Sequence, residues 1–376
     1  MTQRSSSKSS RGRIILGAMS GTSADGVDVA ATHIVGCGLN MRAKLLGLAS
    51  QPFPRPLRQS ILHIRSTGRC TLAELANVGH EITLHYAKAA GRITRQLSLQ
   101  PSDIACIAAH GQTLFHAPPL TIQWFDPALL SVRTGCTVIS DFRRADCALG
   151  GPGAPLVPFA DYLLFRHKTV NRVLLNIGGI ANITYLPAGA VPENVVAFDT
   201  GPGNCLSDAI AREQLSRDYD PAGRFAGLGQ ASTKCVTAFL RDHYFTKPWP
   251  KSTDGPQMLR IFQSIRATKS LTANDQLATA CMCCAATVQR AISALGTVDQ
   301  IIVAGGGAKN ATLMRLLADQ TRLPLSTTSE LGIPVEAREA MAFALLAAAT
   351  LDGVPSNIPN VTGARAPAIL GSVTRV

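Results

Sequence analysis

The sequence is poor in aromatic residues and has no apolar run long enough to cross a membrane. Aromatic side chains make up 5% of the 376 residues, too few for an obvious platform on which nucleic-acid bases would stack. The longest apolar stretches, such as AMAFALLAAATL, are shorter than the ~18–20 residues of a membrane span. The opening segment MTQRSSSKSSRGR lacks the apolar core of a secretory signal. We therefore expect a cytoplasmic protein that uses neither a membrane nor a nucleic acid.

Cysteines are present, but not in the pattern of a zinc site or a disulfide scaffold. Ten cysteines are scattered through mostly apolar contexts. The densest group, CMCCAATVQRAI, contains Cys281, Cys283 and Cys284, but no second CxxC pair accompanies it at zinc spacing. Because small thiols commonly pack helix interfaces, we expect buried free thiols and no metal held by this cluster.

Basic residues outnumber acidic residues in this chain, and this excess bears on the charge of a binding partner. Lys and Arg number 36 against 24 Asp and Glu, for a net charge of +12. Four of the cations lie in residues 1–13, which we interpret as a disordered basic tail, and the others are dispersed. A basic protein suits an anionic small substrate as well as it suits nucleic acid.

Two segments share one layout: an apolar strand, a turn of small residues and a second strand. They cover residues 13–34 and 171–186, and each is followed by alternating strand and helix patterns. Such alternation indicates an α/β protein with partly parallel sheets, here in two similar lobes. We expect an N-terminal lobe over 14–147, rejoined by 355–376, and a C-terminal lobe over 148–354. The boundary falls in the Gly- and Pro-rich stretch ALGGPGAPLVP.

The turn of the first segment, GTSADGVD at residues 21–28, carries more polar groups than a hairpin requires. Small residues expose backbone N–H groups, and the Thr22 and Ser23 hydroxyls add donors, so the turn suits phosphate oxygens. It is not a P-loop, because GxxxxGK[ST] does not match. A phosphate site and a long, well-capped hairpin both remain open on this motif alone.

Two later loops combine glycines with polar residues at the ends of predicted strands. AGGGAKN, residues 304–310, opens a helix and suits a nucleotide, because glycines permit close approach and a helix N-terminus favours anions. Tight packing of strand on helix is the alternative. FDTGPGN places Asp199 at a strand end, where it could act as a general base or cap the next helix.

Taken in order, eight segments resemble the 1,6-anhydro-N-acetylmuramic acid kinases, a family of the actin/hexokinase/Hsp70 (ribonuclease H-like) fold group. The matching segments extend over nearly the whole chain and are MSGTSADGVD, HGQT, SDFRRAD, GGPGAPLVP, NIGGIANIT, FDTGPGN, GGGAKN and EAMAFALLA.

The resemblance implies two similar α/β lobes with a central ATP cleft, and it assigns roles to the loops. ATP with Mg²⁺ is the implied cofactor, and a homodimer is implied as well. Asp199 becomes the catalytic base, and no direct protein ligand for Mg²⁺ is assigned, although Asp25 and Asp28 are both candidates. The implied ATP-binding residues are Gly21, Thr22, Ser23, Ala24, Asp25, Gly26, Val27 and Asp28 at the phosphates, and Gly305, Gly306, Gly307 and Asn310 near the adenosine.

The implied chemistry explains why a carboxylate is needed. In a 1,6-anhydro sugar O6 is locked in an acetal with C1, so no free hydroxyl is available for phosphorylation. Asp199 would deprotonate a water that attacks C1, and O6 would leave C1 while accepting the γ-phosphoryl group. The product would be N-acetylmuramic acid 6-phosphate, formed in cell-wall (peptidoglycan) recycling. The residues expected at the sugar are His110, Gln112 and Asp141, with Arg143 and Arg144 as partners for its lactyl carboxylate.

One stretch departs from the family pattern, and two other functions remain open. DGPQM at 254–258 follows Pro-Lys-Ser-Thr where Gly-Arg-Glu is expected, which affects the local loop. A kinase of a related anhydrosugar such as levoglucosan would share Asp199 and the ATP loops. A nucleotide-switched interaction module would instead hydrolyse ATP regardless of any sugar.

Overall fold

The computed structural model describes residues 12–375, and the chain forms two compact units. Unit 1 consists of Met1–Leu164 and Glu336–Val376, and unit 2 of Phe165–Val335. The expected boundaries at 147/148 and 354/355 differ from these by about one helix each. Most of the tail that we expected over 1–13 lies outside the described residues, but Arg13 already belongs to the first strand.

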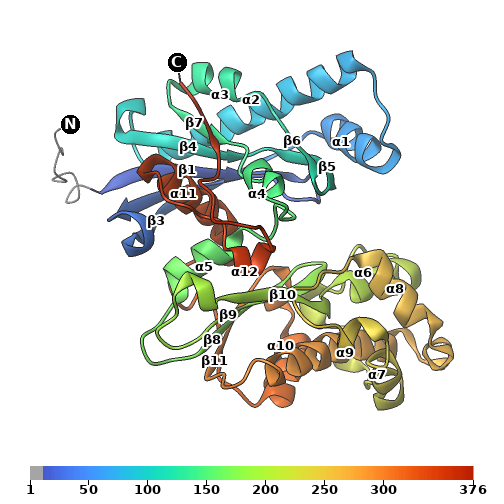
Figure 1. The fold of residues 1–376 in the computed structure, drawn as a ribbon. Helices are drawn as coiled ribbons and strands as arrows, with labels where there is room; N and C mark the ends of the chain where they lie inside the picture. Colours follow the sequence, from blue (N-terminus) through green and yellow to red (C-terminus); the bar gives the residue numbers. More distant parts are fainter. Residues whose placement is uncertain (1–11, 376) are drawn as a thin grey trace. The chain divides into compact units, whose positions relative to one another are not determined.

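Unit 1 is built on a six-stranded sheet in the order β13-β7-β4-β1-β2-β3 (Figure 1). Strands β1, β2 and β3 form an antiparallel meander, and β4 and β7 add to it in parallel. A separate two-stranded sheet joins β5 to β6. The strands are β1 Arg13–Met19, β2 Gly26–Val35, β3 Arg42–Pro52, β4 Ile104–His110, β5 Gln112–Ala117, β6 Leu120–Trp124, β7 Val138–Ser140 and β13 Ser372–Thr374.

Helices cover both faces of this sheet. The expected amphipathic helix is α2, which begins at a capping box between Thr71 and Glu74 and buries Val78, Ile82 and Ile93 in the core against β2 and β3. The apolar helix α11 packs on β1, β2 and β4 (Figure 1). The helices of unit 1 are α1 Arg55–Thr67, α2 Leu72–Gln96, α3 Pro127–Thr134, α4 Arg144–Ala148, α5 Val157–Phe165, α11 Arg338–Asp352 and α12 Pro359–Thr362.

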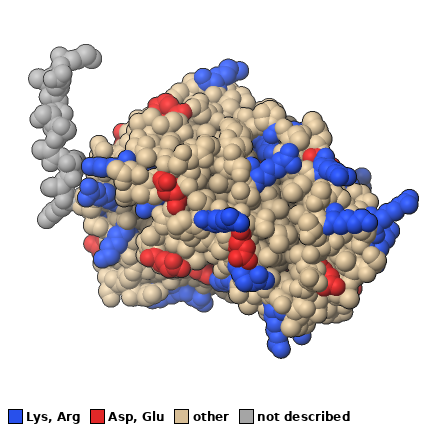
Figure 2. Space-filling model, turned by 90° about the horizontal axis from the view of Figure 1, so that it is seen from below, with Lys and Arg blue, Asp and Glu red and all other residues tan. Residues whose placement is uncertain are grey.

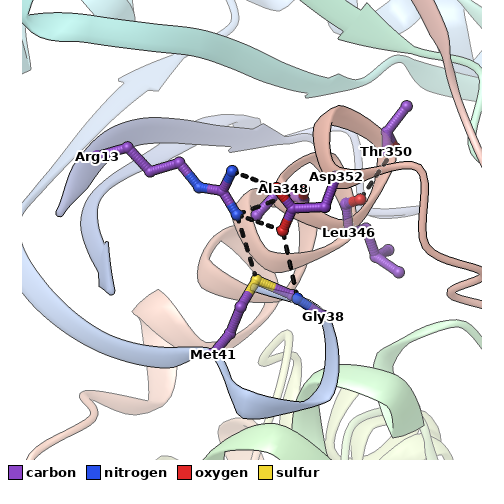
Figure 3. A network of polar contacts seen from close by, with 7 residues as sticks. All are labelled: Arg13, Gly38, Met41, Leu346, Ala348, Thr350 and Asp352. Carbon is purple, nitrogen blue, oxygen red and sulfur yellow. Dashed lines mark hydrogen bonds and ion pairs between the residues drawn. The ribbon is translucent and has the colours of Figure 1, made fainter. Parts of the chain in front are cut away.

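Ion pairs at both ends of α11 explain why this helix belongs to unit 1. At its start Arg338 donates two hydrogen bonds to Asp161 of α5, at 2.9 and 2.5 Å, and both side chains are buried. At its end Asp352 accepts both arms of the Arg13 guanidinium, each at 2.6 Å (Figure 3). Bidentate pairs of this kind fix orientation as well as position. The unit boundaries therefore fall at the end of α5 and just before α11 rather than inside the Gly-rich loop.

Unit 2 contains a five-stranded sheet in the order β10-β9-β8-β11-β12. Strands β8, β9 and β10 form an antiparallel meander, while β11 lies parallel to β8 and β12 parallel to β11. The strands are β8 Arg172–Ile177, β9 Ile180–Leu186, β10 Val196–Pro202, β11 Gln300–Ala304 and β12 Leu325–Thr327.

The core of unit 2 lies between this sheet and helices that include α9 and α10 (Figure 1). The cysteine-rich segment forms the middle of α9, and its three thiols are buried as expected. Burial raises the pKa of Cys281 to about 12, so this sulfur stays a neutral thiol. The helices are α6 Cys205–Leu215, α7 Thr233–Phe239, α8 Gly255–Ser264, α9 Ala273–Ser293 and α10 Ala311–Thr321.

The two sheets repeat one plan, which confirms the expected pair of similar α/β lobes. In each unit a three-stranded antiparallel meander is extended by two parallel strands on the side of its first strand. On the face shown in Figure 2, Lys and Arg are scattered rather than gathered in one patch. Over residues 12–375, no helix has both the length and the apolar character that crossing a bilayer requires.

Candidate functional site

The turn at residues 21–28 lies between β1 and β2 and presents polar groups to solvent. Thr22 and Ser23 are exposed, whereas Ala24 is fully buried and has a left-handed backbone with φ of 52°. A Cβ added to Gly21 would meet no heavy atom nearer than 3.8 Å, but one added to Gly26 would lie 2.5 Å from a carbonyl oxygen of β3. Gly21 therefore borders open space, and Gly26 is required for packing.

Two arginines of α1, which the sequence analysis did not select, hold this turn. Arg65 donates to the Thr22 carbonyl, and Arg58 donates to the Ser23 carbonyl at 3.4 Å. Arg58 also pairs with Asp25 at 2.9 Å. The turn thus combines exposed hydroxyls with two guanidinium groups, and a polyphosphate would find both hydrogen-bond donors and positive charge there. The only sequence signal for them was their place in an exposed helix directly after the meander.

Gln112 contacts the 21–28 turn on its buried side and does not face solvent. Its side chain is fully buried, accepts a hydrogen bond from Ser20 Oγ at 2.6 Å and donates one to the Gly21 carbonyl at 3.1 Å. Both ends of the amide are therefore committed to the turn. The structure thus shows Gln112 holding the turn, and its expected contact with the sugar remains a prediction.

The buried His110, at the end of β4, pairs with the partly buried Arg143. The Arg143 guanidinium donates to His110 Nε2 at 2.9 Å and to the Gly153 carbonyl at 2.7 Å. Burial, together with the charge of Arg143, holds the pKa of His110 well below its usual value, and burial lowers the pKa of Arg143 to about 10. Because a guanidinium can only donate, the neutral imidazole carries its proton on Nδ1. The His110 ring also stacks on Phe343, with centroids 4.4 Å apart.

Asp141 and Arg144 form an exposed pair close by in the chain. Arg144 donates through Nε to Asp141 Oδ2 at 2.7 Å, and 68% of the Arg144 side chain is exposed. Asp141 has a left-handed backbone with φ of 61°. Of the two arginines expected at the sugar carboxylate, Arg144 is therefore open to a ligand, while Arg143 holds the loop at Gly153.

Glu339 lies in the first turn of α11 and opens the EAMAFALLA segment. No role was predicted for its carboxyl group. Burial raises its pKa, while the charges of Arg338 and Arg143 oppose the rise and that of Asp28 adds to it. Asp28, which pairs with Met19 across β1 and β2, accepts a hydrogen bond from Ser50. Two carboxyl groups of unit 1, Asp28 and Glu339, thus interact at the end of the 21–28 turn.

Asp199 lies on β10, at the edge of the unit 2 sheet, next to a bulge in the pairing with β9. Its Oδ2 accepts a hydrogen bond from the Thr253 backbone N–H at 3.0 Å. Burial raises the pKa of Asp199 to about 6, although the Thr253 hydrogen bond opposes the rise. A carboxylate with this pKa is ionised at neutral pH and still basic enough to take a proton from water in a transition state.

The segment that precedes α8, residues 244–253, covers the Asp199 strand and was not assigned a role from sequence. Tyr244 donates its hydroxyl to the Asp199 carbonyl at 2.7 Å, and the Asp199 N–H donates to the Lys251 carbonyl at 3.0 Å. The DGPQM stretch at 254–258, which departs from the family pattern, forms the start of helix α8. Asp254 accepts a hydrogen bond from Gln257 N–H at 2.7 Å and caps this helix. The departure from the family pattern therefore gives a capped helix start.

Asp208, in the first turn of α6, is a second unit 2 carboxyl group with a shifted pKa. Burial raises its pKa to about 6, with Arg212 opposing the rise. Unlike Asp199, it follows the FDTGPGN segment instead of lying within it. It is therefore the natural comparison for any test of the base.

The GGGAKN loop follows β11, and its three glycines differ in their surroundings. A Cβ on Gly305 would lie 2.5 Å from the Ile177 carbonyl oxygen, and one on Gly307 would lie 2.2 Å from the Ile177 side chain. On Gly306 the nearest atom would be Asn204 Nδ2, at 3.9 Å. Gly306 alone of the three borders open space, whereas Gly305 and Gly307 permit the loop to pack on β8.

Asn310 ends the GGGAKN loop as a helix cap. Its Oδ1 accepts a hydrogen bond from Leu313 N–H at 2.9 Å, its Nδ2 contacts the Cys281 sulfur at 3.7 Å, and the side chain is buried. The expected contact between Asn310 and the nucleotide remains a prediction. Asn310 orients the start of α10.

The Gly178-Gly179 turn of the β8–β9 hairpin joins the same group of loops. The Gly178 carbonyl accepts a hydrogen bond from Asn204 N–H at 2.8 Å, and the Gly179 carbonyl accepts one from Cys205 N–H at 3.0 Å. A Cβ on Gly179 would meet nothing within 4 Å. Unit 2 therefore brings together three small-residue loops, at 178–179, 202–205 and 305–307, with Asp199 on the strand that leads into one of them.

Comparison with known proteins matches nearly the whole chain to one protein family. The sequence profile for "Anhydro-N-acetylmuramic acid kinase" matches residues 13–376. A protein of that name from Salinibacter ruber is 36% identical over 381 residues, covering 96% of each chain. One from Gloeobacter violaceus is 38% identical over 375 residues, covering 96% of this chain and 98% of its own. One from Bacillus cereus is 33% identical over 376 residues, with the same coverage.

Proposed function

The chain belongs to the anhydro-N-acetylmuramic acid kinase family and is a phosphotransferase, and from that premise we propose how its residues divide the reaction. It transfers the γ-phosphoryl group of ATP to O6 of 1,6-anhydro-N-acetylmuramic acid while water opens the anhydro ring. The product is N-acetylmuramic acid 6-phosphate, in the recycling of cell-wall sugars. The observation that carries the proposal is the partly buried Asp199 carboxylate, with its pKa raised to about 6 and one oxygen fixed by the Thr253 N–H.

Asp199 is the base in this proposal. Its free carboxylate oxygen takes a proton from a water molecule, and the water oxygen forms a bond to C1 as the C1–O6 bond breaks. The electrons of the broken bond stay on O6, which attacks the γ-phosphorus and releases ADP. Tyr244, the Lys251 carbonyl and Thr253 hold the Asp199 backbone and carboxylate in place, and correct positioning of a reacting group lowers the barrier of a reaction.

The phosphate groups of ATP are bound, in this proposal, by the 21–28 turn. Thr22 and Ser23 offer exposed hydroxyls, and Arg58 and Arg65 add positive charge at the same turn. Gln112 keeps the turn in shape from the buried side. In unit 2 Gly306 borders open space, so the nucleotide can lie close to the backbone there.

The carboxylates of unit 1 fit a magnesium ion carried with ATP. Hard oxygen donors are what Mg²⁺ prefers, and Asp28 interacts with a second carboxyl group, Glu339, whereas Asp25 is already paired with Arg58. Asp28 is therefore the better of the two expected ligands. When bound, the ion neutralises charge that develops on the transferred phosphoryl group.

Arg144 is our proposed partner for the lactyl carboxylate of the sugar. It is the exposed member of the Arg143–Arg144 pair, and its present partner Asp141 holds the guanidinium in a surface ion pair. Arg143 acts through His110 and Gly153 as a positioning residue. Location in the cytoplasm and assembly as a homodimer are further proposals, supported by the resemblance to the family.

The test of the function is an isotope experiment in ¹⁸O-labelled water with ATP and the anhydro sugar. The proposal predicts one ¹⁸O atom at C1 of the product and phosphate on O6, read by mass spectrometry and ³¹P NMR. Label in the phosphate, or phosphorylation without ring opening, would contradict it. Levoglucosan, which lacks the lactyl and acetamido groups, serves as the control sugar and should be turned over far more slowly.

A further inference from the structure

A cavity of about 300 Å³ lies in unit 2 on the opposite face of β10 from the Asp199 side chain. Phe198 and Thr200, the strand neighbours of Asp199, line it, and successive side chains of a strand point to opposite faces. The rest of the lining comes from the segment at 245–251 and from the last turns of α9, where Thr287 and Arg290 lie. The reaction described above makes no use of this cavity.

The charged side chains that line the cavity are all cationic. They are Lys247, Lys251 and Arg290, and no acidic residue is among the lining residues. Arg290 donates to the Leu240 carbonyl at 3.0 Å, and Lys251 Nζ donates to the Tyr244 carbonyl at 3.3 Å. Carbonyl partners leave the positive charges in place. Burial and the neighbouring charges of Arg290 and Lys247 lower the pKa of Lys251, as expected for three cations around one space.

An aromatic wall accompanies the cations. Trp249 stacks on Phe198 with ring centroids 5.3 Å apart and planes within 5° of parallel, and 41% of the Trp249 surface is exposed. Lys251 Nζ lies 5.8 Å from the Phe198 centroid and 4.8 Å from that of Tyr244. A polar but uncharged ring, such as a sugar, could lie against the indole while an anionic group meets the cations.

We propose that this cavity is a second binding site, for a small phosphomonoester or free phosphate, distinct from the site at Asp199. The volume is at the lower end of the range for small-molecule pockets, so the occupant is a molecule the size of phosphate or a sugar phosphate rather than a polymer. Three cations and no carboxylate in the lining match a dianionic phosphate group, and the indole beside them matches a sugar ring. The inference does not depend on the identity of the sugar substrate.

The cavity shares a chain segment with the catalytic carboxylate, so its occupant should affect turnover. Residues 244–253 supply Lys247, Trp249 and Lys251 to the cavity. The same residues supply the Tyr244 hydroxyl, the Lys251 carbonyl and the Thr253 N–H to Asp199. A ligand that draws the lysines together therefore acts on the segment that fixes the base.

The chain contains two tryptophans, which permits a direct measurement of binding. In a Trp124→Phe variant the remaining indole, Trp249, reports on the cavity. Titration with inorganic phosphate and, separately, with glucose 6-phosphate should give a saturable fluorescence change, whereas glucose should give none. A response to both phosphates identifies a site for the phosphate group, and a tighter response to glucose 6-phosphate shows that the sugar ring contributes.

Lys247→Gln is the decisive variant, because Lys247 is exposed and lies outside the catalytic machinery. It should weaken phosphate binding at least fivefold, while Lys269→Gln, an exposed lysine elsewhere in unit 2, should leave it unchanged. Isothermal titration of the otherwise unaltered chain repeats the comparison if Trp124→Phe does not fold. Absence of saturable binding at 10 mM phosphate, or equal binding to the Lys247→Gln variant, would overturn the proposal.

The outcome is separable from that of the proposed function, because the titrations contain neither ATP nor the anhydro sugar. The effect on turnover is tested in a second step. Glucose 6-phosphate at saturation should change kcat at least twofold in the unaltered enzyme, and the Lys247→Gln variant should need at least fivefold more glucose 6-phosphate for the half-maximal change. Binding without such a difference would overturn the coupling to Asp199 and leave the site itself supported.

Discussion

The two units share one strand plan but differ in the turn of their first hairpin. In unit 1 the β1–β2 turn is long, exposes hydroxyls and is held by arginines of α1. In unit 2 the β8–β9 turn is reduced to Gly178-Gly179, and the chemical groups lie instead on β10 and the segment that covers it. In the proposed function one scaffold therefore carries two tasks, with anion binding on one copy and a base on the other.

The largest effect is expected from the carboxylate that distinguishes unit 2. Asp199→Asn keeps the size of the side chain but removes the base, and we expect kcat to fall about 10²–10⁴-fold with ATP binding retained. Asp208→Asn is the matched control, because burial raises the pKa of both carboxyl groups to about 6. Steady-state kinetics of both variants makes the comparison. A loss confined to Asp208→Asn would assign the base to α6.

Substitutions at Gly306 and Gly307 distinguish the role of the GGGAKN loop in packing from its proposed role in nucleotide binding. In Gly307→Ala the new Cβ would lie 2.2 Å from Ile177, so we expect a loss of stability of about 1–3 kcal/mol from overpacking, measured by urea unfolding. Gly306→Ala faces open space and should leave stability unchanged while raising KM for ATP about tenfold, equivalent to about 1.4 kcal/mol. Equal stability of the two variants would show that the loop does not pack on β8 as described.

A smaller effect is expected at the turn of unit 1. Arg65→Ala removes the hydrogen bond to the Thr22 carbonyl and one positive charge, so KM for ATP should rise about fivefold, or about 1 kcal/mol, with kcat little changed. Arg69→Ala, at an exposed position just after the same helix, is the control. If both variants behave alike, general surface charge and not the turn geometry governs nucleotide binding.

The repeated fold was predictable because its signals are local. The two hairpins, the amphipathic stripe of α2 and the apolar run of α11 follow from residue periodicity, and the resemblance set their order along the chain. The unit boundaries were harder to predict from the sequence. They depend on the ion pairs of Asp161 with Arg338 and of Arg13 with Asp352, which join residues more than 170 positions apart. No pattern in the sequence indicates such partners.

The candidate site was predictable at its motifs but not in its supporting residues. Asp199 and the 21–28 turn could be selected from the sequence, whereas Arg58, Arg65 and Thr253 act on them from other elements. Two further expected ligand contacts fall on side chains that are buried and already hydrogen-bonded, and these contacts remain predictions. Gln112 and Asn310 are polar residues in loop motifs, but their side chains are committed to Ser20 and to Leu313, respectively.

The pH dependence of kcat/KM tests most directly whether the Asp199 carboxylate is the base. Burial raises the pKa of this group to about 6, so lowering the pH through that value protonates the carboxylate and removes its basicity. The account predicts a rate that is level above about pH 7 and falls tenfold per unit below about pH 6, with this limb absent from the residual rate of Asp199→Asn. A rate that stays level down to pH 5, or the same limb in the variant, would contradict it.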